Sequence, residues 1–211
     1  MTILTLLSPA PPARPAAAAT APTLAVAAAR QGLRPRVLRL ALAAHARAVE
    51  SGAVTRGRLT VIDYSLASRE RRLWVLDLET QRVLARELVA HGSGSGGDLP
   101  RRFSNRPGSY ASSLGSFLTG ATYRGRHGLS LRLHGLDAGL NDRAEARGIV
   151  VHGAKYVNDG IVRVLGRLGR SQGCPALSPA AARRIIPLIA GGSVLFGYYP
   201  SPELERAPAS R

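Results

Sequence analysis

A single cysteine and a histidine upstream of it are the residues best suited to covalent chemistry in this sequence. Cys174 stands in Ser-Gln-Gly-Cys-Pro at 171–175, and His152 precedes it by 22 positions in Val-Val-His-Gly-Ala at 150–154. A structural cysteine is typically buried among apolar residues, whereas this one has polar and turn-forming neighbours. The flanking glycine allows a tight backbone and the proline ends a strand, so we expect a thiol presented at a turn. Spacing alone leaves a reactive thiol and an incidental one equally open.

Acyl transfer needs a nucleophile, a base and donors for the developing oxyanion, and the chain offers one candidate for each. A thiol with a pKa near ~8.5 is only slightly ionised at neutral pH, so a neighbouring imidazole must lower that pKa or take the proton. His152 is the candidate base, with a core histidine satisfied by the backbone as the alternative. The N–H groups of Gly173 and Cys174 would form the oxyanion hole, and Ser171 would brace the turn.

The two motifs and their order resemble a known family. His-Gly at 152–153 followed by Ser-x-Gly-Cys at 171–174 is similar to the active-site signature of the L,D-transpeptidases of bacterial peptidoglycan, most closely the murein branch that reads Gly-Cys-Pro-Ala. Further stretches that resemble this branch occur at 61–65, 72–75, 103–105, 112–115 and 127–131, within residues 35–200. Many family members carry an arginine two residues after the cysteine. This chain has Ala176 there, so that substrate anchor is not carried over.

The resemblance implies a β-sandwich catalytic domain and a cysteine-dependent reaction. In that reaction Cys174 attacks a tetrapeptide stem at the L-centre of diaminopimelate, releases D-alanine and forms a thioester. The carbonyl of Gly153 would orient the His152 imidazole. The acceptor is left open among a second stem, a lipoprotein lysine and water, so the enzyme would be a transferase or a hydrolase (carboxypeptidase). Peptidoglycan would be the partner and the periplasm or cell envelope the location.

Two other functions stay open on the sequence. A cysteine peptidase or amidase would use the same pair of residues. A non-catalytic module that binds peptidoglycan or another polyanion would fit the net charge of +16, which comes from 29 Lys and Arg against 13 Asp and Glu. The arginines are spread along the chain and aromatic residues make up 5%, without a nucleic-acid-binding motif, so we expect no nucleic-acid partner. A solvated basic surface explains the charge equally well.

Several further residues are weaker candidates for substrate binding. Arg167 and Arg170 flank the cysteine loop and could pair with stem carboxylates, although a solvated basic loop is equally compatible with the sequence. Lys155 and Tyr156 could shape the donor pocket, and His134 could line the cleft from the polar face of its strand, with a surface role as the alternative. One cysteine and scattered histidines do not make a zinc site, so we expect no metal and no cofactor.

The order of elements predicts a mainly β domain at 34–200. We expect a helix at 34–51, strands at 59–65, 72–78, 83–90, 128–134, 148–152 and 193–199, and a helix at 178–190 that Pro187 kinks or shortens. A flexible glycine-rich loop is expected at 91–97.

Residues 1–33 are predicted to be a degenerate leader or Ala/Pro-rich linker, and 201–211 a mobile tail. The apolar run after Met1 is short and has no positive charge before Arg14. No apolar run is long enough to span a membrane. The sequence does not indicate an oligomeric state.

Overall fold

The computed structural model describes residues 23–205. Within them lie eight strands: β1 Arg58–Asp63, β2 Arg71–Asp77, β3 Arg82–Leu88, β4 Gly115–Gly125, β5 Gly128–Gly135, β6 Val150–Gly153, β7 Ala176–Leu177 and β8 Val194–Tyr198. The helices are α1 Leu24–Arg30, α2 Pro35–Glu50, α3 Asp159–Leu165, α4 Pro179–Ile189 and α5 Pro202–Glu205, with a 3₁₀ turn at Ser93–Ser95. The predicted mainly β fold class is confirmed.

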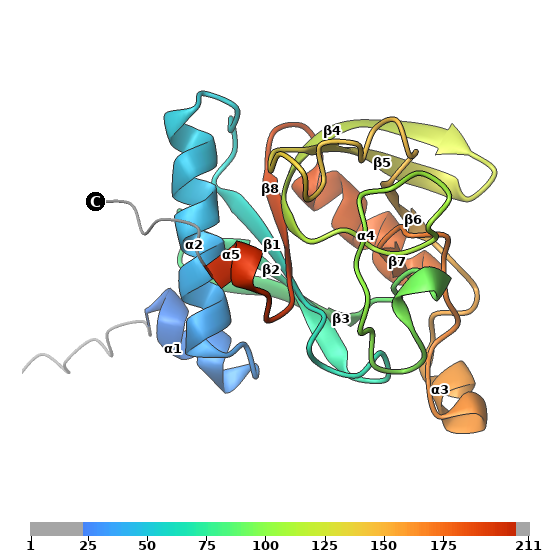
Figure 1. The fold of residues 1–211 in the computed structure, drawn as a ribbon. Coiled ribbons are helices and arrows are strands. Elements are labelled where there is room, and N and C mark those ends of the chain that lie inside the picture. The colour runs from blue at the N-terminus through green and yellow to red at the C-terminus, as the bar shows by residue number, and fades with distance from the viewer. Residues whose placement is uncertain (1–22, 206–211) are drawn as a thin grey trace, which may run out of the picture.

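All eight strands belong to one sheet, in the order β3-β2-β1-β8-β4-β5-β6-β7 (Figure 1). β1, β2 and β3 form the antiparallel meander expected from the sequence, and β8 returns parallel to β1. Past the end of β3, Ala90 pairs with Ala176 of β7, the strand at the other edge of the sheet. The two edges therefore meet beside residues 171–174, so the sheet's closure positions the cysteine loop.

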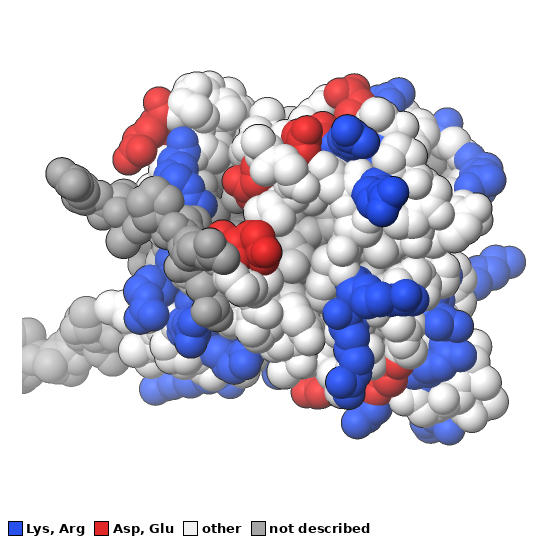
Figure 2. Space-filling view, in the orientation of Figure 1, with Lys and Arg blue, Asp and Glu red and all other residues white. Residues whose placement is uncertain are grey.

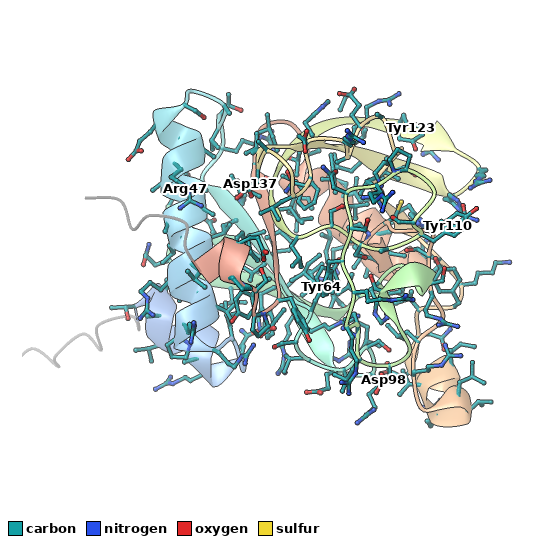
Figure 3. All side chains as sticks on the ribbon, in the orientation of Figure 1. Arg47, Tyr64, Asp98, Tyr110, Tyr123 and Asp137 are labelled. Carbon is teal, nitrogen blue, oxygen red and sulfur yellow. The ribbon has the colours of Figure 1, made fainter. Side chains whose placement is uncertain are left out.

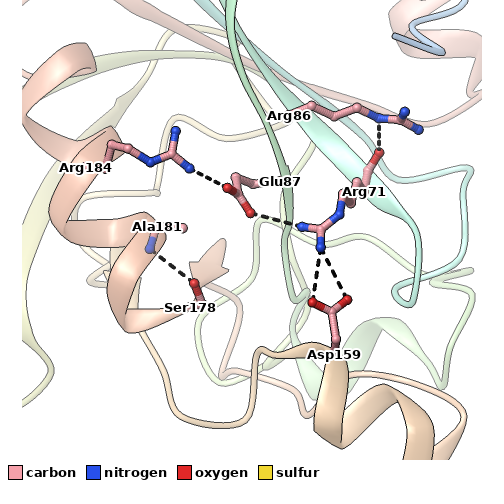
Figure 4. Close-up of polar contacts among 7 residues, drawn as sticks. All are labelled: Arg71, Arg86, Glu87, Asp159, Ser178, Ala181 and Arg184. Carbon is pink, nitrogen blue, oxygen red and sulfur yellow. Dashed lines mark hydrogen bonds and ion pairs between the residues drawn. The ribbon is translucent and has the colours of Figure 1, made fainter.

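Helix α4 packs on the inner side of this curled sheet, against β1, β4, β5, β6 and β7. It begins where the sequence predicts, because the Ser178 hydroxyl accepts the Ala181 N–H and Pro179 occupies the first helical position (Figure 4). Ile185, Ile186 and Ile189 are buried in the main core. The helix continues through Pro187 to Ile189, so it is not shortened there.

Helix α2 covers the β1–β8 part of the sheet from outside (Figure 1). Val37, Leu38, Ala41, Ala44 and Ala48 are buried at helical spacing, which is the amphipathic pattern expected for 34–51. The helix also borders α1. These two helices lie away from the cysteine loop, so their role here is to close the core.

The boundary predicted at residue 33 is wrong for the described part of that segment. Leu24–Arg30 forms α1, with Leu24 and Ala28 buried, and Leu33 is buried as well. The indole N–H of Trp74 donates to the Gln31 carbonyl at 3.0 Å, which ties the segment to β2. Alanine favours helix strongly, so this composition forms a helix once it has a surface to pack on. Residues 1–22, where the leader was predicted, lie outside the described residues.

Two other segments predicted to be mobile are packed. Residues 91–97 hold the 3₁₀ turn, and His91 and Ser95 are fully buried in it. At the other end of the chain, α5 forms at Pro202–Glu205 and buries Leu204. The remainder of the predicted tail, residues 206–211, lies outside the described residues.

Ion pairs join α3 and α4 to the meander. Glu87 of β3 lies between Arg71 of β2 and Arg184 of α4, and Arg71 also pairs with Asp159 at the start of α3 (Figure 4). The first turn of α3 is capped by Asn158, whose side chain accepts the Ile161 N–H at 2.8 Å. These contacts hold the chain on both sides of the cysteine loop.

Candidate active site

An open cleft of about 870 Å³ contains both Cys174 and His152. The β4–β5 hairpin forms one wall, residues 107–110 and 146–148 a second, and residues 170–174 a third. Tyr110 and Tyr123, which lie on the same side of the molecule in Figure 3, are part of the lining. The structure thus brings the two principal sequence candidates into one cavity.

The cysteine loop is a tight turn held by its own serine. The Ser171 hydroxyl donates to the Cys174 carbonyl at 2.6 Å and accepts the Gly173 N–H at 3.1 Å. Gly173 has a φ of 121°, and a Cβ on it would lie 2.9 Å from the Ala111 carbonyl oxygen. Only glycine fits this conformation and this space without strain.

The same bonds change the expected oxyanion hole. Because the Gly173 N–H is donated to Ser171, it does not point at the same place as the Cys174 N–H. Among the described residues, the Cys174 N–H donates to no other residue, and the group it lies beside is its own sulfur. The structure therefore leaves one of the two predicted donors available for a ligand.

Ser112 fixes the orientation of that donor from behind the loop. Its buried hydroxyl donates to the Gly173 carbonyl at 3.0 Å and accepts the Gly92 N–H at 3.0 Å. No described peptide bond is cis, and in a trans peptide the C=O and the following N–H point in opposite directions. With the Gly173 carbonyl turned inward, the Cys174 N–H is turned outward.

A buried polar cluster of Tyr64, Arg72 and His91 supports Ser112. The Tyr64 hydroxyl hydrogen-bonds the Ser112 side chain, and burial raises the pKa of Tyr64 to about 12, which keeps it protonated. The Arg72 guanidinium lies over the Tyr64 ring, 5.3 Å from its centroid, and donates to Nδ1 of His91 at 2.7 Å. The His91 carbonyl in turn accepts the Ser171 N–H at 3.0 Å, so the cluster touches the cysteine loop at two points.

His152 lies in β6 with its ring fixed by the backbone. Its Nδ1 is 3.0 Å from the Gly153 carbonyl oxygen, an acceptor, so Nδ1 carries the proton and Nε2 is the basic nitrogen. The ring of His127 stacks on it, with centroids 4.4 Å apart. This is the Gly153 contact that the family resemblance implies, and the His127 stack adds to it.

Burial favours the neutral form of both groups. Burial raises the pKa of the Cys174 thiol above its ordinary value, opposed by nearby hydrogen bonds and the charges of Arg147 and Arg126. Burial also lowers the pKa of His152, opposed by the Gly153 carbonyl, with His127 and Arg126 lowering it further. The directions of these two pKa shifts favour proton transfer to the imidazole during attack over a resting ion pair.

The thiol is directed at the backbone in this state. Cys174 Sγ donates to the Gly148 carbonyl oxygen at 3.7 Å, and no hydrogen bond to His152 is present among the described residues. β7 pairs Ala176 with His152, which sets Cys174, two residues earlier, level with the start of β6.

Arg147 holds the second wall of the cleft, a role that the sequence did not indicate. Its two terminal nitrogens donate to the Ser104 and Ala111 carbonyls at 2.6 Å, and to the Ser113 and Ser109 hydroxyls. The guanidinium thus ties residues 104–113 to the cleft while its charge acts on the Cys174 thiol.

Position 176 cannot supply a substrate anchor in this fold. Ala176 is fully buried and packs with Leu88, Ala90, Ala154, Val157 and Leu168 in a second apolar cluster. An arginine there would be buried in that cluster unless the local packing changed.

The weaker sequence candidates divide into two groups. Tyr156 and Arg170 line the cleft. His134, Lys155 and Arg167 are outside the lining, and His134 pairs instead with Glu145 at 3.1 Å.

Arg126, His127 and Arg147 line the cleft although the sequence analysis did not select them. The sequence carries a signal for His127 alone, because it begins the family-like stretch at 127–131.

Within residues 23–205, no helix has the length and apolar character that a membrane span requires. Among the same residues there is no group of three or more His, Cys, Asp and Glu side chains that could hold a metal ion.

The fold and the cleft define a mainly β protein with a thiol and an imidazole in one cavity. The chain belongs to the L,D-transpeptidase catalytic domain family, which matches residues 29–198. This confirms the resemblance found in the sequence. A comparison with curated protein sequences gives no match.

Several solved structures also match parts of this chain. An L,D-transpeptidase from Mycobacterium smegmatis shares 16% identity with a TM-score of 0.41, over 68% of this chain and 59% of that one. One from Stackebrandtia nassauensis shares 15% identity with a TM-score of 0.41, over 85% and 78%. The helical cell shape determining protein Pgp2 from Campylobacter jejuni shares 13% identity with a TM-score of 0.45, over 72% and 54%. This chain thus spans about three fifths of the length of the M. smegmatis structure.

Proposed function

We propose that this protein is a peptidoglycan L,D-transpeptidase that works through a Cys174 thioester. The observation that carries the proposal is the placement of Cys174 and His152 in one cleft, with the thiol on a glycine-dependent turn and Nε2 as the basic nitrogen. Family membership supplies the substrate class, a peptide stem of the cell wall.

In the first half of the reaction, the sulfur of Cys174 bonds to the carbonyl carbon of diaminopimelate at its L-centre while the thiol proton moves to Nε2 of His152. The carbonyl oxygen takes up negative charge and accepts the Cys174 N–H, which the Ser112 bond to the Gly173 carbonyl holds outward. Collapse breaks the peptide bond, and the departing D-alanine amine takes the proton from His152. The product is a thioester on Cys174.

In the second half, an amine or water attacks the thioester and gives its proton to His152. The thiol leaves with that proton, so the enzyme returns to its starting state. Transfer to a stem amine makes a crosslink, transfer to a protein lysine anchors that protein, and transfer to water shortens the stem.

Incubation of the protein with purified tetrapeptide muropeptides, followed by mass spectrometry of the products, tests the proposal. Release of D-alanine with formation of dimers or tripeptides is expected. Cys174→Ala and Cys174→Ser should both abolish turnover and keep the fold, because the turn is set by residues 171 and 173. Residual turnover above a few per cent in either variant would overturn the nucleophile assignment.

The substrate requires a location outside the cytoplasm, so we also propose the periplasm or cell envelope. Fractionation of cells that express the native locus should find the protein with envelope markers. Recovery only with cytoplasmic markers would count against a murein substrate.

A further inference from the structure

We propose that Arg126, at the tip of the β4–β5 hairpin, binds a carboxylate of the acyl donor. The inference rests on the proposed function for the identity of the donor, but the anion site itself does not depend on it. Position 176 is buried in an apolar cluster, so an anchor for the substrate must come from another part of the cleft.

The lining of the cleft favours an anion. Arg126, Arg147 and Arg170 are among the described residues that line it, and no Asp or Glu is. A cavity with cations and no acidic side chain concentrates negatively charged ligands near its walls. A peptide stem that ends in free carboxylates has this charge.

Of the three arginines, Arg126 has its terminal nitrogens available. Both terminal nitrogens of Arg147 already donate to protein acceptors, four in all. One terminal nitrogen of Arg170 donates to the Gly96 carbonyl at 2.9 Å. The hydrogen bond of Arg126 runs from Nε to Nε2 of His127 at 3.0 Å. Arg126 forms no ion pair with a described acidic residue. A guanidinium with both terminal groups available binds a carboxylate through two parallel hydrogen bonds.

His127 couples this cation to the reacting groups. Because the arginine Nε can only donate, His127 accepts with Nε2, and its ring stacks on His152 at 4.4 Å. The charge of Arg126 contributes to lowering the pKa of both Cys174 and His152, which places it near both groups. A carboxylate held by Arg126 would therefore place the adjoining peptide beside the sulfur.

The sharpest test compares two alkylating reagents that differ in charge. Iodoacetate is an anion and iodoacetamide is neutral, and both react with the thiolate of Cys174. The ratio of their rates therefore cancels any change in thiol pKa and reports the local preference for a carboxylate. We expect Arg126→Gln to lower the iodoacetate-to-iodoacetamide ratio about 3- to 10-fold at low salt.

The matched control is Arg132→Gln. Arg132 is an exposed arginine of the same hairpin whose guanidinium lies over the Tyr123 ring, outside the lining. Figure 2 shows basic side chains spread over much of one face, so a general charge effect is possible and this control measures it. The proposal would be overturned if the iodoacetate-to-iodoacetamide ratio fell equally in both variants, or if it did not fall in Arg126→Gln.

A second arm uses the substrate. With tetrapeptide muropeptides, Arg126→Gln should lower kcat/KM about 10- to 100-fold, mainly through KM. Amidation of the stem carboxylates should lower the wild-type value by a similar factor and leave Arg126→Gln almost unchanged. If amidation lowers kcat/KM equally in the wild type and in Arg126→Gln, Arg126 does not bind the stem carboxylate. If wild-type protein turns over no muropeptide, the proposed function fails, while the alkylation ratio still decides the anion site.

Discussion

The hydroxyl of Ser112 donates to the carbonyl oxygen of Gly173 at 3.0 Å, from the buried side of the cysteine loop. This bond sets the plane of the Gly173–Cys174 peptide and so directs the Cys174 N–H toward the cleft. The same hydroxyl accepts the Gly92 N–H and hydrogen-bonds Tyr64. One buried side chain therefore connects the polar cluster to the donor proposed for the oxyanion.

Ser112→Ala is expected to lower kcat for muropeptides about 10- to 100-fold, because the donor is no longer held in place. Iodoacetamide labelling of Cys174 should change little, since the thiol stays accessible. The variant should also lose about 1–3 kcal/mol of stability by leaving buried polar groups unpaired.

Ser193→Ala is the matched control for the loss of stability in Ser112→Ala. Ser193 is also buried and its hydroxyl bonds the Ile189 carbonyl at 2.6 Å, outside the cleft lining. It should be destabilised similarly and keep its kcat. Equal kcat values in the two variants would mean that Ser112 acts through stability alone.

The neutral resting state of the pair predicts an unusual pH dependence of alkylation. Because burial raises the thiol pKa, thiolate forms only as the pH rises through that raised value. The midpoint of iodoacetamide labelling should therefore lie above the ~8.5 of a free cysteine. A midpoint below neutrality would indicate a resting thiolate–imidazolium pair instead.

His152→Ala should lower kcat about 10²- to 10⁴-fold, since the proton acceptor is lost. The alkylation midpoint should move little, because the resting thiol is not paired with the imidazole. His134→Ala, which removes a histidine outside the cleft lining, should leave kcat unchanged. If His134→Ala lowered kcat strongly and His152→Ala lowered it only slightly, His134 would be the proton acceptor instead of His152.

The buried His91 predicts a loss of stability in acid. Burial lowers the pKa of His91 to about 4, below the ordinary 6.5 of the unfolded chain. Between these values the unfolded chain binds more protons, so the stability is full above pH 6.5 and falls as the pH decreases toward 4. The loss from this group should reach up to about 3 kcal/mol.

Urea unfolding at several pH values measures the effect. The free energy of unfolding should depend less on pH between 6.5 and 4 in His91→Gln than in the wild type. The variant should also be less stable than the wild type at neutral pH. An unchanged pH dependence in His91→Gln would show that His91 binds its proton over the same pH range in the folded and unfolded protein.

Local patterns were sufficient to predict much of this fold. The strands of the meander, β5, β6, β8 and both longer helices follow from apolar periodicity or from capping residues such as Ser178. β4 was not predicted, because its glycines and a register shift between Thr119 and Thr122 interrupt the alternation. α3 was not predicted either, since it buries none of its residues and so has no amphipathic pattern.

The site was predictable only in part, for a similar reason. Cys174, His152 and Gly153 lie in short motifs that the sequence displays. Ser112 and Arg126 act through contacts with Gly173 and His127 that depend on how the sheet closes and where the hairpin tip falls. Their residue types alone gave no reason to select them among many serines and arginines.

The reaction of Cys174 with a carbapenem tests the central claim most directly. The strained lactam presents a carbonyl to the thiol, so a site that performs acyl transfer should open it and retain the acyl group. Intact-protein mass spectrometry should show one adduct of the drug's mass on the peptide that contains Cys174. The adduct should be absent in Cys174→Ala and form more slowly in His152→Ala. If iodoacetamide labels Cys174 while no carbapenem adduct forms, the thiol is accessible but the acyl-transfer site is not assembled, and the account is contradicted.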